Sequence, residues 1–416
     1  MTSPDDSGER IRAGRPLILF GAFDRHNFGD LLLGQIARVL ASPDPVVFAG
    51  LADRDLSKYG GESVRAITAL AKEWGDSPAE VLHVGGELLT CTLYEAAVML
   101  QPDESAQRVM ARHDSDPEGG HLWAALNLGL DQAIAYQISR RLFRRSGFFG
   151  YLGVGGMDLD LQPDEVREEV FSRLGEADHV WVRDRETHRQ LTMAGIQAQL
   201  APDHAELTPN LFGSIIEERV LADRQGVLWE RFPAGYLAAQ FSADFGDDAT
   251  LAIIGRQLRQ VQREHGLGIV FFRTGAAPWH DCLDVYCRLL QEMSDLDACI
   301  FESLDIWDIC ALLARSRGFV GSSLHGRIVA KAFGHPAVSL VRKAGARSKV
   351  RVYVASWRPE ALQTVVSPDA VLAAWCHALM LERGNRRQRQ LVVAAADAFR
   401  RARGLAPLWA GTSIQA

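Results

Sequence analysis

Short apolar runs alternate with amphipathic stretches through the second half of the chain, and this alternation constrains the fold more than any other feature. Strands that are buried on both faces of a parallel sheet have near-continuous apolar runs of this kind. The runs are "YLAAQFS", "GIVFFRTG", "ACIFES", "GFVGS" and "PAVSLV". Helical stretches separate them, and "ATLAIIGRQLRQVQREHG" ends on Gly266, a C-cap signal. The pattern predicts repeated βα units and an α/β fold.

The first half of the chain shows the same alternation less regularly. Strands are predicted at "PLILFGAF", "PVVFAGL" and "EVLHVGGELL", and a helix at "LLLGQIARVLA". Between residues 91 and 145 we expect two helices, "LYEAAVMLQ" and "DQAIAYQISRRLFRRS", joined by a polar loop. The alternation breaks again within residues 205–227, which we interpret as a boundary between two units.

Two successive α/β units predict two Rossmann-like domains that face a cleft. We assign residues 16–210 to the first domain, residues 226–385 to the second and residues 386–405 to a C-terminal amphipathic helix. Ligands of such sheets bind beyond the carboxyl ends of the strands. Polar residues that directly follow the predicted strands are therefore the candidate site residues.

Composition excludes several classes of function. The chain has 45 basic and 52 acidic residues, a net charge of −7, which argues against binding nucleic acid through bulk charge. It has no apolar run near the ~18 residues that span a bilayer. None of its six cysteines has C-x-x-C spacing, so neither a zinc site nor a redox dithiol is indicated. We expect reduced thiols, a cytoplasmic protein and no bound metal.

Polar clusters follow the predicted strands at several places in the sequence. They are His26–Asp30, Gly85–Glu87, Arg183–Asp184, Asp203–His204 and Ser322–Arg327. Each cluster alone has an ordinary explanation as a turn, a close packing of backbones or a solvated charge run. Their shared position at strand ends favours a common site instead.

The last cluster, "GSSLHGR", combines several anion-binding features. Ser322 and Ser323 are preferred N-cap residues, and a helix N-terminus favours an anion by ~0.3–1 kcal/mol. The guanidinium of Arg327 suits a carboxylate or a phosphate, and His325 can donate a proton near neutral pH. Capping serines and a structural histidine are the alternative. The combination suits an anionic substrate that needs acid catalysis.

An ordered set of motifs runs through residues 17–340 and resembles the polysaccharide pyruvyl transferase family. The matching residues are Asn27, Gly29 and Asp30; Gly85 and Gly86; Arg183 and Asp184; Pro202 and Asp203; and Ser323, Leu324, His325, Ala330, Gly334 and Pro336. The chain departs from the family at two of these motifs. Ser323 stands where many members have arginine, and the family's glycine triplet ends in Glu87.

The resemblance implies a transferase with a fold similar to the GT-B glycosyltransferases. Members of the family move a pyruvyl group from phosphoenolpyruvate to a pair of sugar hydroxyls, form a cyclic ketal and release phosphate. Arg183 and His325 fall on family positions that hold or activate the donor. The implied partners are this small donor and a glycan or glycan precursor as acceptor, with no cofactor besides the donor substrate itself.

We assign roles on that basis. His325 is expected to act as general acid and Asp30 as base on the acceptor hydroxyl, while Arg183 and Arg327 hold the donor. The remaining expected binding residues are Asn27, Gly29, Gly85, Gly86, Glu87, Asp203, Ser322 and Ser323.

Other interpretations stay open. A nucleotide-sugar glycosyltransferase of GT-B type would share the architecture, and a non-catalytic homologue could serve as a binding partner. The segment "RRLFRRSGFF", Arg140–Phe149, would touch anionic lipid if the acceptor were lipid-linked. A solvated basic helix end is the alternative for that segment. The oligomeric state is not indicated.

Overall fold

The N-terminal lobe is built on an eight-stranded sheet with the order β3-β4-β2-β1-β5-β6-β7-β8. The computed structural model describes residues 16–222, 227–381 and 386–409. All neighbouring strands of this sheet are parallel except β3 and β4. The strands are β1 Leu17–Phe20, β2 Val46–Gly50, β3 Arg54–Asp55, β4 Ser63–Ala66, β5 Glu80–Val84, β6 Phe149–Val154, β7 His179–Val182 and β8 Gln199–Leu200.

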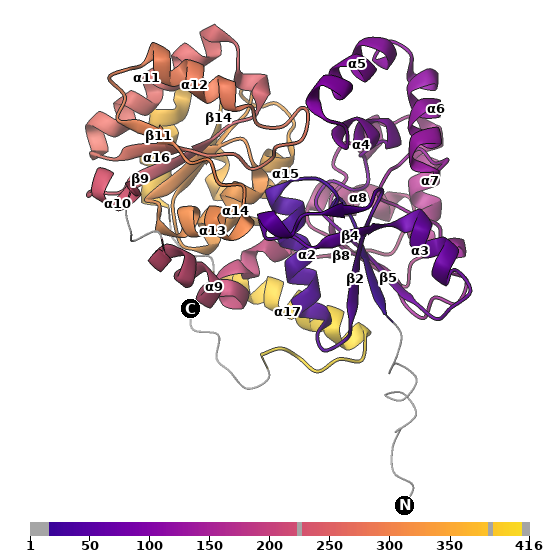
Figure 1. Cartoon of the computed structure of the whole chain (residues 1–416). Coiled ribbons are helices and arrows are strands. Elements are labelled where there is room, and N and C mark those ends of the chain that lie inside the picture. The colour runs from indigo at the N-terminus through magenta and orange to yellow at the C-terminus, as the bar shows by residue number, and fades with distance from the viewer. Residues whose placement is uncertain (1–15, 223–226, 382–385, 410–416) are drawn as a thin grey trace, which may run out of the picture.

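Helices cover this sheet and rise above it (Figure 1). They are α2 Phe28–Ala41, α3 Ile67–Trp74, α4 Leu93–Met99, α5 Asp103–His113, α6 Pro117–Leu128, α7 Asp164–Gly175 and α8 Arg185–Met193. The strands are apolar because both of their faces are covered, and every residue of β1 is fully buried.

The C-terminal lobe contains a six-stranded parallel sheet with the order β11-β10-β9-β12-β13-β14. Its strands are β9 Tyr236–Gln240, β10 Gly268–Phe271, β11 Ala298–Ile300, β12 Gly318–Gly321, β13 Ala337–Leu340 and β14 Val365–Val366. Its helices are α10 Val227–Arg231, α11 Asp248–His265, α12 Leu283–Glu292, α13 Ile306–Arg315, α14 Leu324–Ala332, α15 Lys349–Trp357 and α16 Val371–Met380. The predicted α/β fold with two Rossmann-like units is confirmed.

Two helices tie the lobes together (Figure 1). Helix α9, Thr208–Ala222, occupies the predicted break in the alternation and packs against α13 of the C-terminal lobe. Helix α17, Arg386–Ala402, returns to the N-terminal lobe, where Arg403 near its end binds Glu80 at 2.6 Å. One apolar cluster therefore runs from α2 through α9 and α13 to α17.

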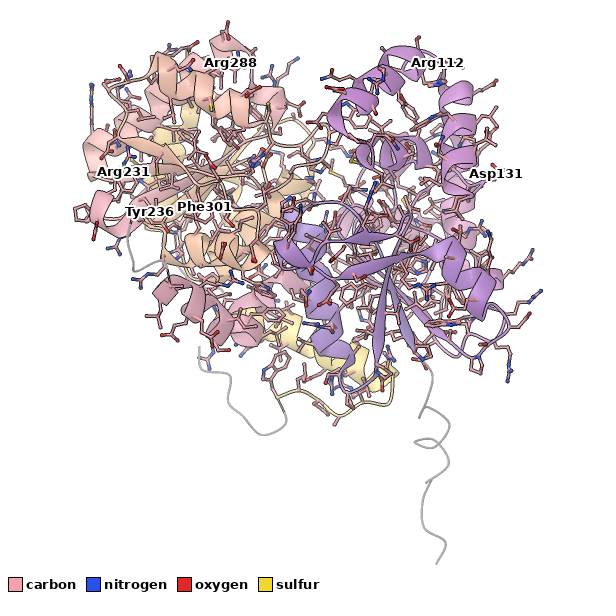
Figure 2. The ribbon with its side chains drawn as sticks, viewed as in Figure 1. Arg112, Asp131, Arg231, Tyr236, Arg288 and Phe301 are labelled. Atoms are coloured by element: carbon pink, nitrogen blue, oxygen red, sulfur yellow. The ribbon has the colours of Figure 1, made fainter. Side chains whose placement is uncertain are left out.

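Charged side chains cover the outer surfaces of both lobes, as Figure 2 shows. Arg112 on α5 and Asp131 beyond α6 are exposed on the N-terminal lobe, and Arg231 is exposed on the C-terminal lobe. Tyr236 lies inward at the start of β9, where its hydroxyl donates to the carbonyl of Leu312 at 2.8 Å.

The structure differs from the prediction in residues 91–145. The interval expected to be a loop contains α5 and α6, whereas residues 131–139 form no helix. Ile134 instead makes an antiparallel bridge to Thr92, and Ile138 N–H donates to His83 Nε2 at 3.3 Å. Nearly every residue from Gln132 to Ile138 is buried. The run is thus covered on all sides, so its apolar spacing does not describe one helical face.

Candidate active site

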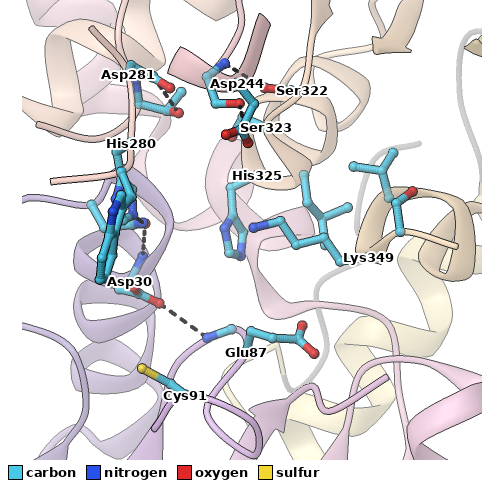
Figure 3. A pocket seen from close by; sticks show the side chains of 18 of the residues that line it. Asp30, Glu87, Cys91, Asp244, His280, Asp281, Ser322, Ser323, His325 and Lys349 are labelled. Atoms are coloured by element: carbon cyan, nitrogen blue, oxygen red, sulfur yellow. Dashed lines mark hydrogen bonds between the residues drawn. The ribbon is translucent and has the colours of Figure 1, made fainter. Parts of the chain in front are cut away.

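A cleft of about 650 Å³ lies between the two lobes, within the usual range for small-molecule sites. The loops after β1, β5 and β12 reach it with Asn27, Gly86 and Ser322. The polar clusters that the sequence places at strand ends therefore converge at the carboxyl edges of two facing sheets. Figure 3 shows Asp30 and Glu87 on one side and Ser323, His325 and Lys349 on the other.

His325 lies in the first turn of α14 and faces the N-terminal lobe across the cleft. Ser323 is the N-cap of this helix, and its hydroxyl accepts from Gly326 N–H at 3.1 Å. The imidazole lies so close to the opposite backbone that a Cβ on Gly29 would come within 1.8 Å of its Nδ1. A Cβ on Gly86 would come within 3.2 Å of its Cε1. Both glycines are needed because the ring passes between them.

Asp203 lies behind His325 and is fully buried. Its Oδ2 is 3.3 Å from Nε2 of His325 and 3.4 Å from NH1 of Arg183. Burial opposes the charged form of this carboxyl, but His325 and Arg183 together hold the pKa of Asp203 well below its usual range. A permanent carboxylate beside Nε2 keeps a proton on that nitrogen in the neutral imidazole. Asp203 thus orients His325 from outside the cleft.

Arg183 lines the cleft, and its guanidinium contacts the carboxylates of Glu87 and Asp203. NH2 of Arg183 is 2.7 Å from Oε2 of Glu87, whose Oε1 accepts from Met157 N–H at 3.1 Å. Burial opposes the charge, yet Glu87 and Asp203 raise the pKa of Arg183. Glu87, the residue that departs from the family's glycine triplet, therefore fixes the guanidinium in place.

The "HNFGD" loop joins the lobes. Oδ1 of Asn27 accepts from Gly29 N–H and Asp30 N–H and so caps α2. Its Nδ2 therefore donates to Nε2 of His280 at 3.1 Å, which leaves the His280 proton on Nδ1, facing the carbonyl of Pro278. Burial, followed by the charges of Arg25 and Lys349, lowers the pKa of His280 to about 3. His280 is therefore a neutral bridge between the lobes.

Asp30, Ser322 and Ser323 line the cleft as predicted, whereas Gly85 does not. Asp30 accepts from Gly86 N–H at 3.3 Å, which holds its carboxylate at the cleft wall. The hydroxyl of Ser322 accepts from Ser242 N–H at 3.0 Å. Gly85 instead adopts a φ of 156° with Leu88 packed against it, so its role is in the turn.

The expectation that Arg327 binds the donor is wrong. Its guanidinium is buried behind α14, where NH1 donates to the Ala337 carbonyl and the Ser339 hydroxyl at 3.1 Å and NH2 donates to Thr364 Oγ1 at 2.9 Å. Arg327 follows His325 by two residues, a rotation of about 200° around a helix, so the two side chains point to opposite faces. Arg327 is absent from the cleft lining and stabilises the packing of α14 on β13.

Two cations that the sequence analysis did not select line the cleft, Arg25 from the N-terminal lobe and Lys349 from the start of α15. Arg25 donates to the hydroxyl of Tyr136. Among the residues that the structure describes, neither Arg25 nor Lys349 forms an ion pair with a carboxylate. Arg342 and Arg347 also line the cleft, but they pair with Asp247 at 3.0 Å and Asp160 at 2.8 Å. In Figure 3 Lys349 reaches towards His325.

Asp281 is a further buried carboxyl in the cleft wall that the motifs did not indicate. It accepts from Thr274 N–H at 2.6 Å and from Gln240 Nε2 at 2.7 Å, while Gln240 Oε1 accepts from Ser323 N–H at 2.9 Å. Burial raises the pKa of Asp281 to about 6. The network positions the N-terminus of α14.

Features outside the cleft bear on the metal and membrane predictions. In the described ranges, the one group of three side chains close enough to share a metal ion is Glu264, His265 and Cys376, none of which lines the cleft. Within the basic segment, Arg140 pairs with Asp178 at 2.8 Å and Arg144 with Asp76 at 2.9 Å. No helix in the described parts of the chain is long and apolar enough to cross a bilayer.

Solved structures share the two-lobed architecture. The chain superposes on UDP-GlcNAc 2-epimerase from Methanocaldococcus jannaschii, in complex with UDP-GlcNAc and UDP, with a TM-score of 0.51, 12% identity and coverage of 92% of this chain and 99% of that one. It superposes on UDP-N-acetylglucosamine 2-epimerase from Rickettsia bellii with a TM-score of 0.50 and 10% identity, and the match covers 93% of this chain and 98% of that one. At these identities the likeness concerns the fold alone, and the predicted GT-B-like class is confirmed.

The sequence of the central part of the chain matches one family model. Residues 150–343 match the model of the polysaccharide pyruvyl transferase family, and the match includes Arg183, Asp203 and His325. This match spans just under half of the chain and supports the predicted resemblance to this family and, with it, a transferase. No curated protein matches the chain significantly.

Proposed function

We propose that this protein is a transferase that moves the pyruvyl group of phosphoenolpyruvate to two hydroxyls of a sugar in a glycan or glycan precursor. The product is a cyclic ketal, and phosphate is released. One observation carries the proposal: a histidine oriented by a buried carboxylate meets an arginine, a helix N-terminus and two cations in a single cleft, and neither cation has an ion-pair partner among the described residues. This arrangement suits a small substrate that bears a carboxylate and a phosphate and needs a proton.

The donor would be held by charge from both lobes. The N-terminus of α14 offers N–H groups to an anion, and Lys349 lies on the same side of the cleft. Arg25 and Arg183 add positive charge from the N-terminal lobe. Because Glu87 and Asp203 already neutralise much of the Arg183 charge, Lys349 and Arg25 supply the attraction that the sequence analysis assigned to Arg327.

The chemistry follows from the needs of an enol phosphate. His325 gives a proton to the methylene carbon, which becomes a methyl group, and the first sugar hydroxyl adds its oxygen to the adjacent carbon. The second hydroxyl oxygen then forms its bond to that carbon as the carbon–oxygen bond to phosphate breaks, with the electron pair leaving on phosphate. One hydroxyl proton replaces the proton given by His325, and the other leaves with phosphate. A positioned histidine typically contributes ~10²–10⁴-fold to such a step.

The carboxylates divide the remaining work. Asp203 keeps the imidazole of His325 oriented. Asp30 lines the cleft from the opposite lobe and would accept the second hydroxyl proton before it passes to phosphate. The scheme uses no metal or cofactor besides the donor, so we expect turnover in the presence of excess chelator. We expect the reaction to take place in the cytoplasm. Peripheral contact with a membrane through Arg140–Phe149 stays a prediction.

The test is thermal stabilisation by candidate donors, because a ligand that binds the native state raises its stability by ~2.7 kcal/mol at 100 times its Kd. We expect phosphoenolpyruvate to raise the melting temperature and UDP or UDP-GlcNAc to leave it unchanged. Stabilisation by the uridine nucleotides alone would favour the nucleotide-sugar alternative. If no donor binds and no phosphate is released with any acceptor, the non-catalytic alternative gains.

A further inference from the structure

A large aromatic side chain stands exposed in the cleft lining. Trp279 lies in the loop between β10 and α12 and is 46% exposed. The other exposed large apolar side chains in the described ranges, such as Leu126 on α6 and Met380 at the end of α16, lie outside the cleft lining. An exposed tryptophan beside polar groups in a substrate cleft is the kind of surface that recognises a ligand.

The backbone of Trp279 is strained. Its φ is 65°, and no other non-glycine residue in the described ranges has a positive φ. A bulky residue in the left-handed region is disfavoured by contacts of its Cβ, and such outliers cluster where a side chain is held for function. Glycine at this position would remove the strain but also the ring. Folding requirements alone therefore do not explain the tryptophan.

The loop around Trp279 is held from several sides. Asp281 N–H donates to the Gly275 carbonyl at 3.2 Å, and the Asp281 carboxylate accepts from Thr274. His280 is fixed by Asn27 of the other lobe, and its ring packs so closely on Gly275 that a Cβ there would lie 2.5 Å from it. These contacts fix both flanks of Trp279, so the backbone of the strained residue is held at a defined place in the cleft wall.

The geometry points to the second substrate as the occupant. The donor proposed above is small and is held by charge at α14, Lys349 and Arg183, whereas the cleft measures about 650 Å³. The reaction requires a diol in the same cleft. A pyranose has a face of C–H groups and a rim of hydroxyls, and the lining offers an aromatic ring together with Asp30, Ser242 and Asp244 as hydrogen-bond partners.

We propose that Trp279 is the platform on which a pyranose ring of the acceptor stacks, so that the site takes its acceptor by the apolar face of the sugar. This inference rests on the proposed function, because it takes the diol substrate from that reaction. Stacking on a rigid aromatic ring orders the sugar at small entropic cost and leaves its edge hydroxyls free for the chemistry.

The experiment is saturation-transfer-difference NMR with a panel of methyl hexopyranosides in the presence of phosphoenolpyruvate. We expect C–H protons of at least one glycoside to receive saturation from the wild-type protein and from Trp279→Phe. Trp279→Ala and Trp279→Gly should weaken that glycoside about tenfold or more, as aromatic stacking losses typically do. The control is Leu126→Ala, which removes an exposed apolar side chain outside the cleft and should bind as the wild type does.

Two further readouts separate the possible outcomes. The melting temperature of Trp279→Gly should be no lower than that of the wild type, so weaker binding cannot be attributed to unfolding. Stabilisation by phosphoenolpyruvate should be the same in the wild type and Trp279→Ala. Equal glycoside binding by Trp279→Ala, or no glycoside contact with the wild type, overturns the inference. If glycoside binding depends on Trp279 but phosphoenolpyruvate does not stabilise the protein, the proposed donor fails and the sugar platform stands.

Discussion

Replacing Asp203 by asparagine tests the core of the site, because this change keeps the shape of the side chain and removes only its charge. The Asp203 carboxylate is fully buried, 3.3 Å from Nε2 of His325 and 3.4 Å from NH1 of Arg183, and it also accepts from Ala205 N–H at 2.9 Å. Asparagine can keep the bond to Ala205, but it cannot act as the counter-charge for the imidazole and the guanidinium.

The expected loss of stability follows from what remains after the change. Removing one partner of a buried ion pair costs ~3–5 kcal/mol, because an uncompensated charge stays buried. Arg183 keeps Glu87 at 2.7 Å, so we expect a value at the lower end, about 3 kcal/mol. The Asp203→Asn substitution should also lower kcat by ~10²–10⁴-fold, because His325 loses the group that orients it as an acid.

The contribution of Asp203 to stability should depend on pH in a defined direction. The folded-state pKa of Asp203 is depressed, so its contribution to stability is fully present above the unfolded value of ~3.9 and is lost as the pH falls through the folded value. The difference in unfolding free energy between wild type and Asp203→Asn should therefore be constant from about pH 5 to 8 and shrink below about pH 4.

The assays are urea unfolding across this pH range and phosphate release from phosphoenolpyruvate. The matched control is Asp295→Asn on the surface of the C-terminal lobe, where Asp295 is 56% exposed and pairs with Arg259. An exposed pair is worth ~0–1 kcal/mol, so the control should change little. A difference that does not shrink in acid, or phosphate release by Asp203→Asn at the wild-type rate, would refute the role of this carboxylate.

Three more substitutions distinguish binding, packing and titration. Lys349→Met should raise KM for phosphoenolpyruvate about tenfold with a smaller change in kcat, because a cation without an ion-pair partner is lost from the cleft; an unchanged KM speaks against it. Arg327→Met should lower the unfolding free energy and leave that KM unchanged, and steady-state kinetics with urea unfolding checks both. The pKa of Asp281 is raised to about 6, so its contribution to stability is present in acid and is lost as the pH rises through about 6. Asp281→Asn should therefore flatten the plot of unfolding free energy against pH between pH 4 and 6, and an unchanged slope contradicts this.

The strands of the fold could be predicted from the sequence because parallel strands covered on both faces must be apolar along their whole length. "LILF" and "GIVF" are such runs, and both are buried throughout. The same rule misled the interpretation of residues 131–138, where apolar residues on all sides look helical but belong to a buried segment without helix. The signals of α6 were present nearby, since Asp116 caps it, Pro117 begins it and Gly129, with a φ of 65°, ends it.

The site could be predicted where it depends on strand ends and not where it depends on side-chain direction. His325, Arg183 and Asp30 meet because parallel strands bring their carboxyl ends to one edge. Helical phase alone, worked out for Arg327 against His325, would have excluded that arginine. Lys349 follows a loop after β13 and belongs to no motif, so only the folded chain brings it to the cleft.

The proposed acid, His325, and the carboxylate that orients it, Asp203, come from different lobes, so the site requires the two lobes to be in contact. Asp203 follows β8 of the N-terminal sheet, and His325 opens α14 on the C-terminal sheet. Their contact at 3.3 Å, the passage of the imidazole beside Gly29 and the bond from Asn27 to His280 all cross the cleft. Any separation of the lobes would move Asp203 away from Nε2 of His325 and leave its carboxylate with Arg183 and Ala205 N–H only. The acid is therefore assembled by the contact between the lobes, and helices α9 and α17, which bind the two lobes to each other, are part of what makes the site competent.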